Sequence, residues 1–141
     1  METIYHYFIV EASRDAVYAA VSSVYGIKNW WADSVTGKYE QGKIIRIVFS
    51  DDMFIELEIL VINQDEYLEW TCSDGPLDWK GTILSFTFEE IDLNNTVVKF
   101  KHSSWREMND FFGECNFHWA HFLRSLKMFC ETGKGLPFST K

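Results

Sequence analysis

Three histidines are the side chains of this sequence best suited to chemistry: His102, His118 and His121. Imidazole binds metals and exchanges protons near neutral pH. His118 and His121 would flank the apolar stripe of a helix at different angles, and no carboxylate stands at a matching spacing, so we expect no metal site. His102 ends an apolar strand face, where we expect a partly buried, hydrogen-bonded group. A polar anchor or acid–base group inside a pocket is the alternative.

The cysteines and the known catalytic motifs do not indicate an enzyme. Cys72, Cys115 and Cys130 form no CxxC pair, so we expect neither a disulfide framework nor a zinc site, and a reducing cytoplasm fits best. Cys72 is expected to face inward without a basic neighbour in the sequence, which is typical of an inert core thiol. No GxSxG, P-loop or dinucleotide motif occurs, and no cofactor is expected.

Aromatic side chains are the unusual feature of the composition, with six Trp, six Tyr and twelve Phe making up 17% of the 141 residues. Such residues fill cores, but they also line pockets for flat or apolar ligands. The Trp30-Trp31 pair either forms the lip of a cavity or divides between the core and a sheet edge. The residues expected to line a ligand-binding cavity are Trp30, Trp31, Phe49, Trp70, Phe86, Phe100, His102, Trp105, His118 and Phe122. Simple core packing is the competing interpretation for the aromatic residues on the strands.

The elements that would hold these residues follow from the period of the apolar side chains. Residues 3–10 are β-branched and aromatic, which predicts a first strand. A helix capped by Ser13 is expected to end at Gly26, and a short helix carrying the Trp pair follows. A period of two then predicts antiparallel strands with one apolar and one polar or mixed face. These strands cover residues 44–50, 53–62, 66–72, 82–90 and 96–102.

A helical period returns near the C-terminus and predicts a long final helix from about Phe117 to Glu131, with Gly113 separating it from a short lead-in. A sheet with one wet face needs a cover on its other face, and only this helix is long enough to supply it. The expected fold class is therefore α+β, with a curved antiparallel β-sheet wrapped around a long C-terminal α-helix and two short helices between strands 1 and 2.

Length and charge narrow the classes of partner. We expect a single domain over residues 1–141, because this length suits one core. The formal net charge of −8 argues against nucleic acid and against an anionic membrane surface as main partners. The first residues lack the basic start and long apolar run of a secretory signal, and every apolar run is too short to cross a membrane.

The order of these elements, with the residues at their corners, resembles the helix-grip superfamily, also called SRPBCC, which includes START domains and the birch-pollen allergen. Within it, the chain is similar to the branch named for the activator of the heat-shock protein 90 ATPase. The matching stretches span essentially the whole chain: Ala16-Val17-Tyr18, Trp30-Trp31, Gly42, Leu68-Glu69-Trp70, Thr96 to Trp105, and Trp119 through Leu123 to Leu126-Lys127. The resemblance implies a START-like domain with an internal cavity. It does not select a function, because members include a co-chaperone domain and handlers of lipids and polyketides.

Three functions remain open at this point. The first is non-enzymatic binding of a small hydrophobic, aromatic or lipid-like ligand between the sheet and the C-terminal helix. The second is a protein-interaction module in a stress or chaperone pathway, which would use an acidic outer sheet face to bind a basic partner. The third is a cyclase- or hydrolase-type enzyme that uses the same cavity with His102 as its polar group. The oligomeric state stays open.

Overall fold

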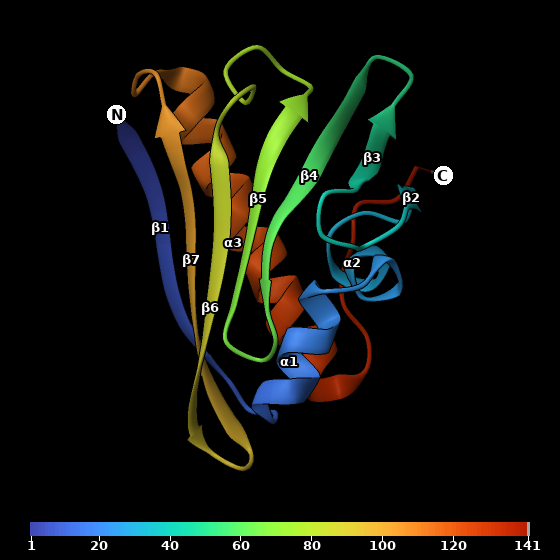
Figure 1. The fold of residues 1–141 in the computed structure, drawn as a ribbon, viewed down its shortest axis with the longest axis vertical. Coiled ribbons are helices and arrows are strands. Elements are labelled where there is room, and N and C mark those ends of the chain that lie inside the picture. Colours follow the sequence, from blue (N-terminus) through green and yellow to red (C-terminus); the bar gives the residue numbers. More distant parts are fainter. Residues whose placement is uncertain (141) are drawn as a thin grey trace.

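An antiparallel sheet of seven strands carries three helices against one of its faces (Figure 1). The computed structural model describes residues 1–140. In spatial order the strands are β1 (Glu2–Val10), β7 (Asn95–Trp105), β6 (Ile83–Asp92), β5 (Tyr67–Asp74), β4 (Met53–Asn63), β3 (Ile44–Ser50) and β2 (Val35–Gly37). The helices are α1 (Arg14–Val21), α2 (Val24–Trp30) and α3 (Asp110–Thr132). The α+β helix-grip fold expected from the sequence is confirmed.

The two short helices lie between β1 and β2 as expected, but the boundary between them differs. α1 ends at Val21, and the Ser23 side chain begins α2 by accepting a hydrogen bond from the Gly26 backbone N–H at 3.0 Å. The prediction that Gly26 ends a helix was wrong. Gly26 lies inside α2, and the Ala20 carbonyl occupies the space that a Cβ at this position would need. Glycine here allows the close approach of α1 and α2.

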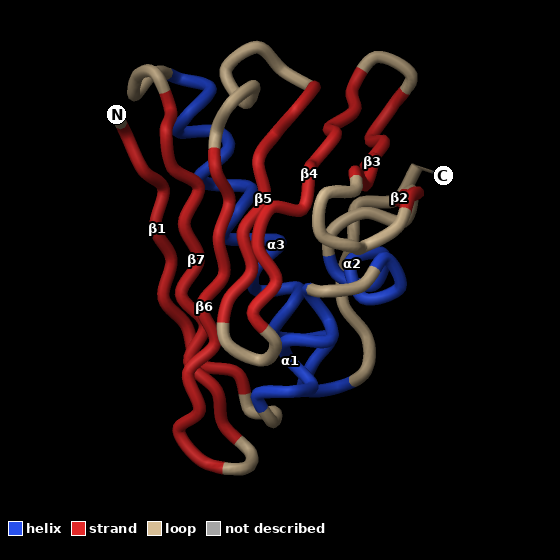
Figure 2. The backbone as a smooth tube through the Cα atoms, viewed as in Figure 1, coloured by secondary structure: helices blue, strands red, loops and turns tan. Residues whose placement is uncertain are grey.

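α3 runs without interruption over a longer stretch than the sequence indicated, as Figure 2 shows. Its first turn is capped by the side chain of Asn109, which accepts a hydrogen bond from the Phe112 N–H at 2.9 Å. The expected start at Phe117 and the expected break at Gly113 were therefore wrong. The position of Gly113 opens to free space, so its missing side chain disturbs no packing. Gly133, with a φ of 85°, ends the helix as predicted.

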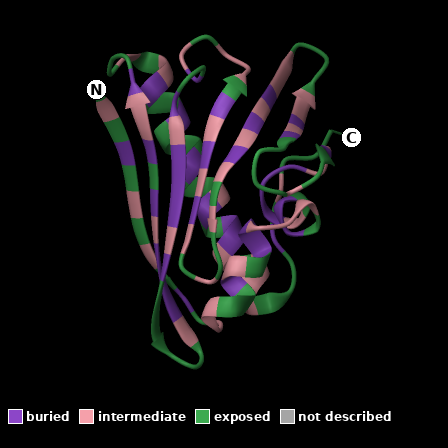
Figure 3. Cartoon of the chain, in the orientation of Figure 1, coloured by how far each residue is buried: buried purple, intermediate pink, exposed green. Residues whose placement is uncertain are grey.

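The strands alternate between a buried inner face and a more exposed outer face (Figure 3). Phe86 pairs with Phe100 and Leu84 pairs with His102 across β6 and β7, which places all four on the inner face. The five strands predicted from the period of two are present. β2 was not expected, because three residues are too few to show a period.

The sheet and α3 are not equally close along their whole length. The α3 backbone packs most closely against α2 and β1. β4 carries two irregularities in its pairing with β5, near Glu56 and near Val61, and such bulges bend a sheet. Of the described strands, only β1 comes this close to the α3 backbone, so β3 and β4 face α3 through their side chains.

Candidate ligand-binding cavity

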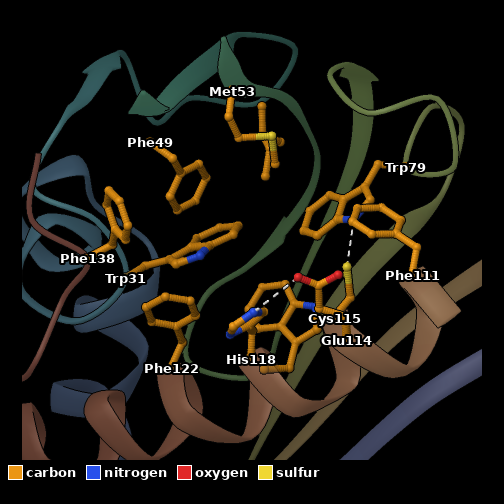
Figure 4. A pocket seen from close by; sticks show the side chains of 12 residues that line it. Trp31, Phe49, Met53, Trp79, Phe111, Glu114, Cys115, His118, Phe122 and Phe138 are labelled. Carbon is orange, nitrogen blue, oxygen red and sulfur yellow. Dashed lines mark hydrogen bonds and ion pairs between the residues drawn. The ribbon is translucent and has the colours of Figure 1, made fainter. Parts of the chain in front are cut away.

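An open cavity of about 270 Å³ lies between the first half of α3 and strands β3 and β4 (Figure 4). Its wall consists of Trp31, Phe49, Met53, Ile55, Trp79, Phe111, Glu114, Cys115, His118, Trp119, Phe122 and Phe138. An apolar cavity of roughly 150 Å³ in another protein binds benzene, so this one has room for a fused two-ring aromatic.

One face of α3 supplies half of this wall. Phe111, Glu114, Cys115, His118, Trp119 and Phe122 follow each other at alternating steps of three and one residues, which brings them to one side of a helix. The first turns of α3, which the sequence did not place in the helix, thus contribute Phe111, Glu114 and Cys115.

Strand β3 and the C-terminal segment close the opposite side. Phe49 continues the inward-facing alternation of Ile45 and Ile47 on β3, and its ring lines the cavity. Its ring centroid lies 5.3 Å from that of Phe138 and 6.4 Å from that of Trp31. Phe138 is held by backbone hydrogen bonds to Trp31 and Asp33, of 2.8 and 3.0 Å. The residues after α3 therefore belong to the site.

Trp79 is the wall residue that sequence reasoning missed most clearly. It lies in the connection between β5 and β6, yet only 5% of it is exposed. A turn closed by the Trp79 N–H and the Pro76 carbonyl at 2.9 Å folds the loop back, and Trp79 Nε1 donates to Cys115 Sγ at 3.3 Å. The usable signal was a large aromatic residue inside a stretch of turn residues, since such a side chain seldom stays in water.

His102 lies behind this wall in a chain of hydrogen bonds. Trp119 Nε1 donates to His102 Nδ1 at 3.1 Å, so the ring proton is on Nε2. Nε2 donates to Thr82 Oγ1 at 2.8 Å, and that hydroxyl donates to the Trp79 carbonyl at 2.6 Å. Burial lowers the pKa of His102 to about 3. His102 is therefore neutral at physiological pH, and neither of its nitrogens is free to act on a molecule in the cavity.

The ten residues expected to line a cavity divide into two groups. Trp31, Phe49, His118 and Phe122 line the cavity. The other six are at most 1% exposed and pack behind its wall; we call them the closed core, comprising Trp30, Trp70, Phe86, Phe100, His102 and Trp105. Core packing, the competing interpretation, accounts for their positions. That the cavity binds a ligand stays a prediction.

The Trp30-Trp31 pair divides between the two regions. Trp30 Nε1 donates to the Ala20 carbonyl at 2.9 Å, which ties its ring to α1. Trp31 turns toward the cavity, and its ring stacks on that of Trp70 with centroids 6.3 Å apart. Adjacent residues thus serve different roles, one in the core and one in the wall.

The polar groups of the cavity lie at its mouth. The side chains of Glu114 and His118 are 63% and 55% exposed, and Glu114 Oε1 lies 3.7 Å from His118 Nε2. Glu114 precedes His118 by four residues on α3, so the premise that no carboxylate stands at a matching spacing was wrong. Deeper in, burial raises the pKa of the Cys115 thiol to about 11, so this sulfur is not a thiolate. Among residues 1–140, no group of three or more His, Cys, Asp or Glu stands close enough to hold a metal.

The outer face of the sheet carries both signs of charge instead of the acidic surface that the second hypothesis assumed. Lys99 pairs with Glu89 and Arg46 pairs with Glu56, each at 2.8 Å. Tyr5 and Tyr7 on β1 are about half exposed on this face, at 51% and 56%. Within the described residues, no helix is both long enough and apolar enough to cross a membrane.

A sequence model of the family described as "Activator of Hsp90 ATPase homolog 1-like protein" matches residues 11–131. The chain belongs to this family. The resemblance found in the sequence is thus confirmed, and the cavity described above lies in an activator of Hsp90 ATPase homolog 1-like fold.

Solved structures extend this assignment. The Aha1 dimer from Colwellia psychrerythraea is 34% identical, with a TM-score of 0.86 over 96% of this chain and 100% of that chain. DynU16, a putative protein in the dynemicin biosynthetic locus, is 20% identical with a TM-score of 0.78; the match covers 96% of this chain and 49% of DynU16. MLL2253 from Mesorhizobium loti is 15% identical with a TM-score of 0.78, over 90% of this chain and 95% of that one.

The two more distant structures show the shared fold alone. No curated protein matches this chain significantly. The family fold and its cavity are those of a ligand-binding or interaction module in the general sense.

Proposed function

We propose that this chain binds a small, largely apolar aromatic molecule in its cavity without transforming it chemically. The observation that carries the proposal is an open cavity of about 270 Å³, in which nine of the twelve wall residues are Trp, Phe, Met or Ile. Burying apolar surface in a preformed site favours binding at about 25 cal/mol per Å² before the costs of association.

The state of the polar groups supports binding over catalysis. The buried thiol of Cys115 stays protonated, since its pKa is raised to about 11. His102 has both ring nitrogens engaged with Trp119 and Thr82. Nucleophilic and acid–base catalysis need an activated group aimed at the substrate, and neither residue supplies one.

Titration with 2-ethylnaphthalene, a neutral two-ring aromatic, tests this proposal. The indole N–H signals of Trp79 and Trp119 in NMR spectra report on the cavity wall, and we expect saturable 1:1 binding with a dissociation constant on the order of 10–100 μM. Ile55→Phe adds bulk to the wall and should abolish binding. Val61→Phe adds the same bulk at a position 37% exposed and should leave binding intact. Absence of binding to the unsubstituted chain, or equal binding by Ile55→Phe, would overturn the proposal.

A second candidate, self-association through the outer sheet face, is supported by two observations. The 34% identical protein from Colwellia psychrerythraea is described as a dimer. The outer face has a hollow bordered by Tyr5 and Tyr67 that also contains Lys101 and Glu69, a mixture that can pair with itself about a two-fold axis.

The three free cysteines are compatible with the cytoplasmic location that we propose for either function.

Sedimentation equilibrium over a wide range of concentrations tests self-association. The double substitution Tyr5→Ser and Tyr7→Ser should shift the chain from dimer toward monomer. Tyr25→Ser removes a tyrosine that is 74% exposed on α2 and serves as the matched control. A chain that is monomeric throughout, or a dimer that the double variant leaves unchanged, would contradict this candidate.

A further inference from the structure

We infer that the molecule bound in the cavity is a fused-ring aromatic amine, with its rings between the aromatic walls and its ammonium group at the mouth beside Glu114. This inference rests on the proposed function and names the chemical class of its ligand. It follows from which polar groups of the wall are already engaged and which are free.

The indole groups of the cavity wall offer no partner to an ammonium group. Trp79 Nε1 donates to Cys115 Sγ, and Trp119 Nε1 donates to His102 Nδ1, so both of these donors are already used within the protein. The third indole of the wall, that of Trp31, can only donate a hydrogen bond, and an ammonium group cannot accept one. An ammonium group placed this deep would lose its water without replacement, which is costly. The part of the ligand that lies against Trp79 and Trp119 must then be apolar, and an ammonium group must reach the mouth.

The shape of the wall favours flat rings for that buried part. Trp31 and Trp119 lie with ring centroids 4.9 Å apart, and Trp79 and Trp119 lie 6.1 Å apart with a 23° angle between their planes. Figure 4 shows Phe49, Phe122 and Phe138 around Trp31, with Trp79 on the other side of the space. Aromatic rings contact such surfaces by offset stacking or edge-to-face packing.

The residues at the mouth of the cavity favour a positively charged group on the ligand. Glu114 is the acidic residue of the wall, and no lysine or arginine of the described chain lines the cavity. A carboxylate only accepts hydrogen bonds, whereas an ammonium group only donates them, so the two match in charge and in hydrogen bonding. His118 Nε2 lies 3.7 Å from Glu114 Oε1. The carboxylate therefore remains within reach of a second donor, the ammonium group of the ligand. The surrounding aromatic faces add a cation–π attraction.

An anionic ligand meets the opposite conditions. The carboxylate of a fatty or aromatic acid would lie beside Glu114 with no lysine or arginine of the wall to balance it, on a chain whose formal net charge is −8. The ligand carboxylate and the Glu114 carboxylate would repel each other, although solvent at the mouth weakens this repulsion. The site therefore discriminates against acids that have the same ring system as a favoured amine.

Three probes that share one ring system test the inference: 2-(aminomethyl)naphthalene, 2-ethylnaphthalene and naphthalene-2-acetate. At low salt we expect the amine to bind about three- to tenfold more tightly than the acid, with the neutral probe between them. Raising the salt concentration should reduce the difference in affinity between the amine and the acid, because the charges lie at the exposed mouth.

Variants at the mouth separate charge from packing. Glu114→Gln should bring the three affinities together, and Glu114→Lys should make the acid the tightest of the three. Glu90→Gln removes one negative charge from an exposed position on β6 and should leave the order unchanged. An acid that binds as tightly as the amine, or an order that Glu114→Lys does not reverse, would overturn the inference. Binding of the neutral probe in that case would leave the proposed function standing, whereas failure of all three probes would remove both.

Discussion

The closed core and the cavity lie side by side and share two tryptophans as a common wall. On the core side, the ring of Trp119 approaches Phe100 to a centroid distance of 4.4 Å, and Trp31 stacks on Trp70. On the other side, the same two residues line an open space. Both regions contain mainly Trp and Phe side chains, so composition does not distinguish the filled region from the empty one.

The difference arises from whether side chains of the two layers meet. Close to β7, the ring of Phe100 on the sheet meets that of Trp119 on α3 with centroids 4.4 Å apart, and the space between the layers is filled. Close to β3 and β4, the side chains of Phe49, Met53 and Ile55 line an open cavity opposite the first half of α3. The contact between the layers therefore decides where a pocket forms in this fold, and aromatic side chains make its walls apolar.

The largest effect expected from this comparison concerns loss of a phenylalanine ring. Phe86→Ala removes a fully buried ring of the closed core and should lower the free energy of unfolding by about 3–5 kcal/mol. Phe122→Ala removes a half-buried ring from the wall of an open space and should cost about 1 kcal/mol. Urea denaturation of the two variants measures both values. Equal losses would show that the two regions are packed alike.

The second-largest expected effect is the loss of stability that His102 causes at acidic pH. The pKa of His102 is about 3 in the folded chain, below the value of about 6.5 expected when the chain unfolds. Below pH 6.5 the His102 imidazole therefore binds a proton in the unfolded chain but stays neutral in the folded chain. The free energy of unfolding falls as a result until about pH 3. Between pH 7 and pH 4.5 this amounts to about 2–3 kcal/mol at 1.36 kcal/mol per unit.

A His102→Gln variant isolates this contribution, because glutamine can still donate and accept hydrogen bonds but does not titrate in this range. The unsubstituted chain should lose about 2–3 kcal/mol more than the variant between the two pH values. Carboxylates elsewhere contribute equally to both proteins and cancel. Parallel pH profiles would mean that His102 reaches water in the folded state.

The period of the side chains was enough to predict the fold, because each strand and the final helix bury one face. Phe86 and Phe100 alternate with polar neighbours, and the last helix has its stripe at Trp119. The helix start was missed since an exposed glycine at position 113 reads as a break, although it costs a helix only about 1 kcal/mol. The Asn109 cap offsets a similar amount.

The division of the candidate residues between core and cavity could not be predicted in the same way. Phe49 and Phe100 both stand on inner faces of strands, and only the position of α3 relative to each strand decides which ring packs against the helix. Trp79 reaches the wall through the fold of a loop, which has no period. Layer separation and loop conformation depend on contacts between distant residues, and a local pattern does not contain them.

One substitution made at two places on the same strand sharpens the comparison further. Ile55 and Ile59 are both fully buried on the inner face of β4, but only Ile55 borders the cavity. Ile59→Phe overpacks the interior and should cost about 1–3 kcal/mol. Ile55→Phe places its ring in free space and should change stability by less than about 1 kcal/mol. Thermal unfolding measures both, and an equal cost at the two positions would contradict a cavity beside Ile55.

The smallest effect separates hydrogen bonding from packing within the closed core. Trp70 Nε1 donates to the Tyr39 hydroxyl, whereas Trp105 Nε1 is the buried side-chain polar atom of residues 1–140 that has no partner. Replacing either residue by Phe removes a similar volume from a fully buried site. Trp70→Phe also leaves Tyr39 without its donor, while Trp105→Phe removes an N–H that was unsatisfied. We therefore expect Trp70→Phe to cost about 1 kcal/mol more in denaturant unfolding. A larger loss for Trp105→Phe would mean that its N–H has a partner in solution, such as a water buried in the closed core.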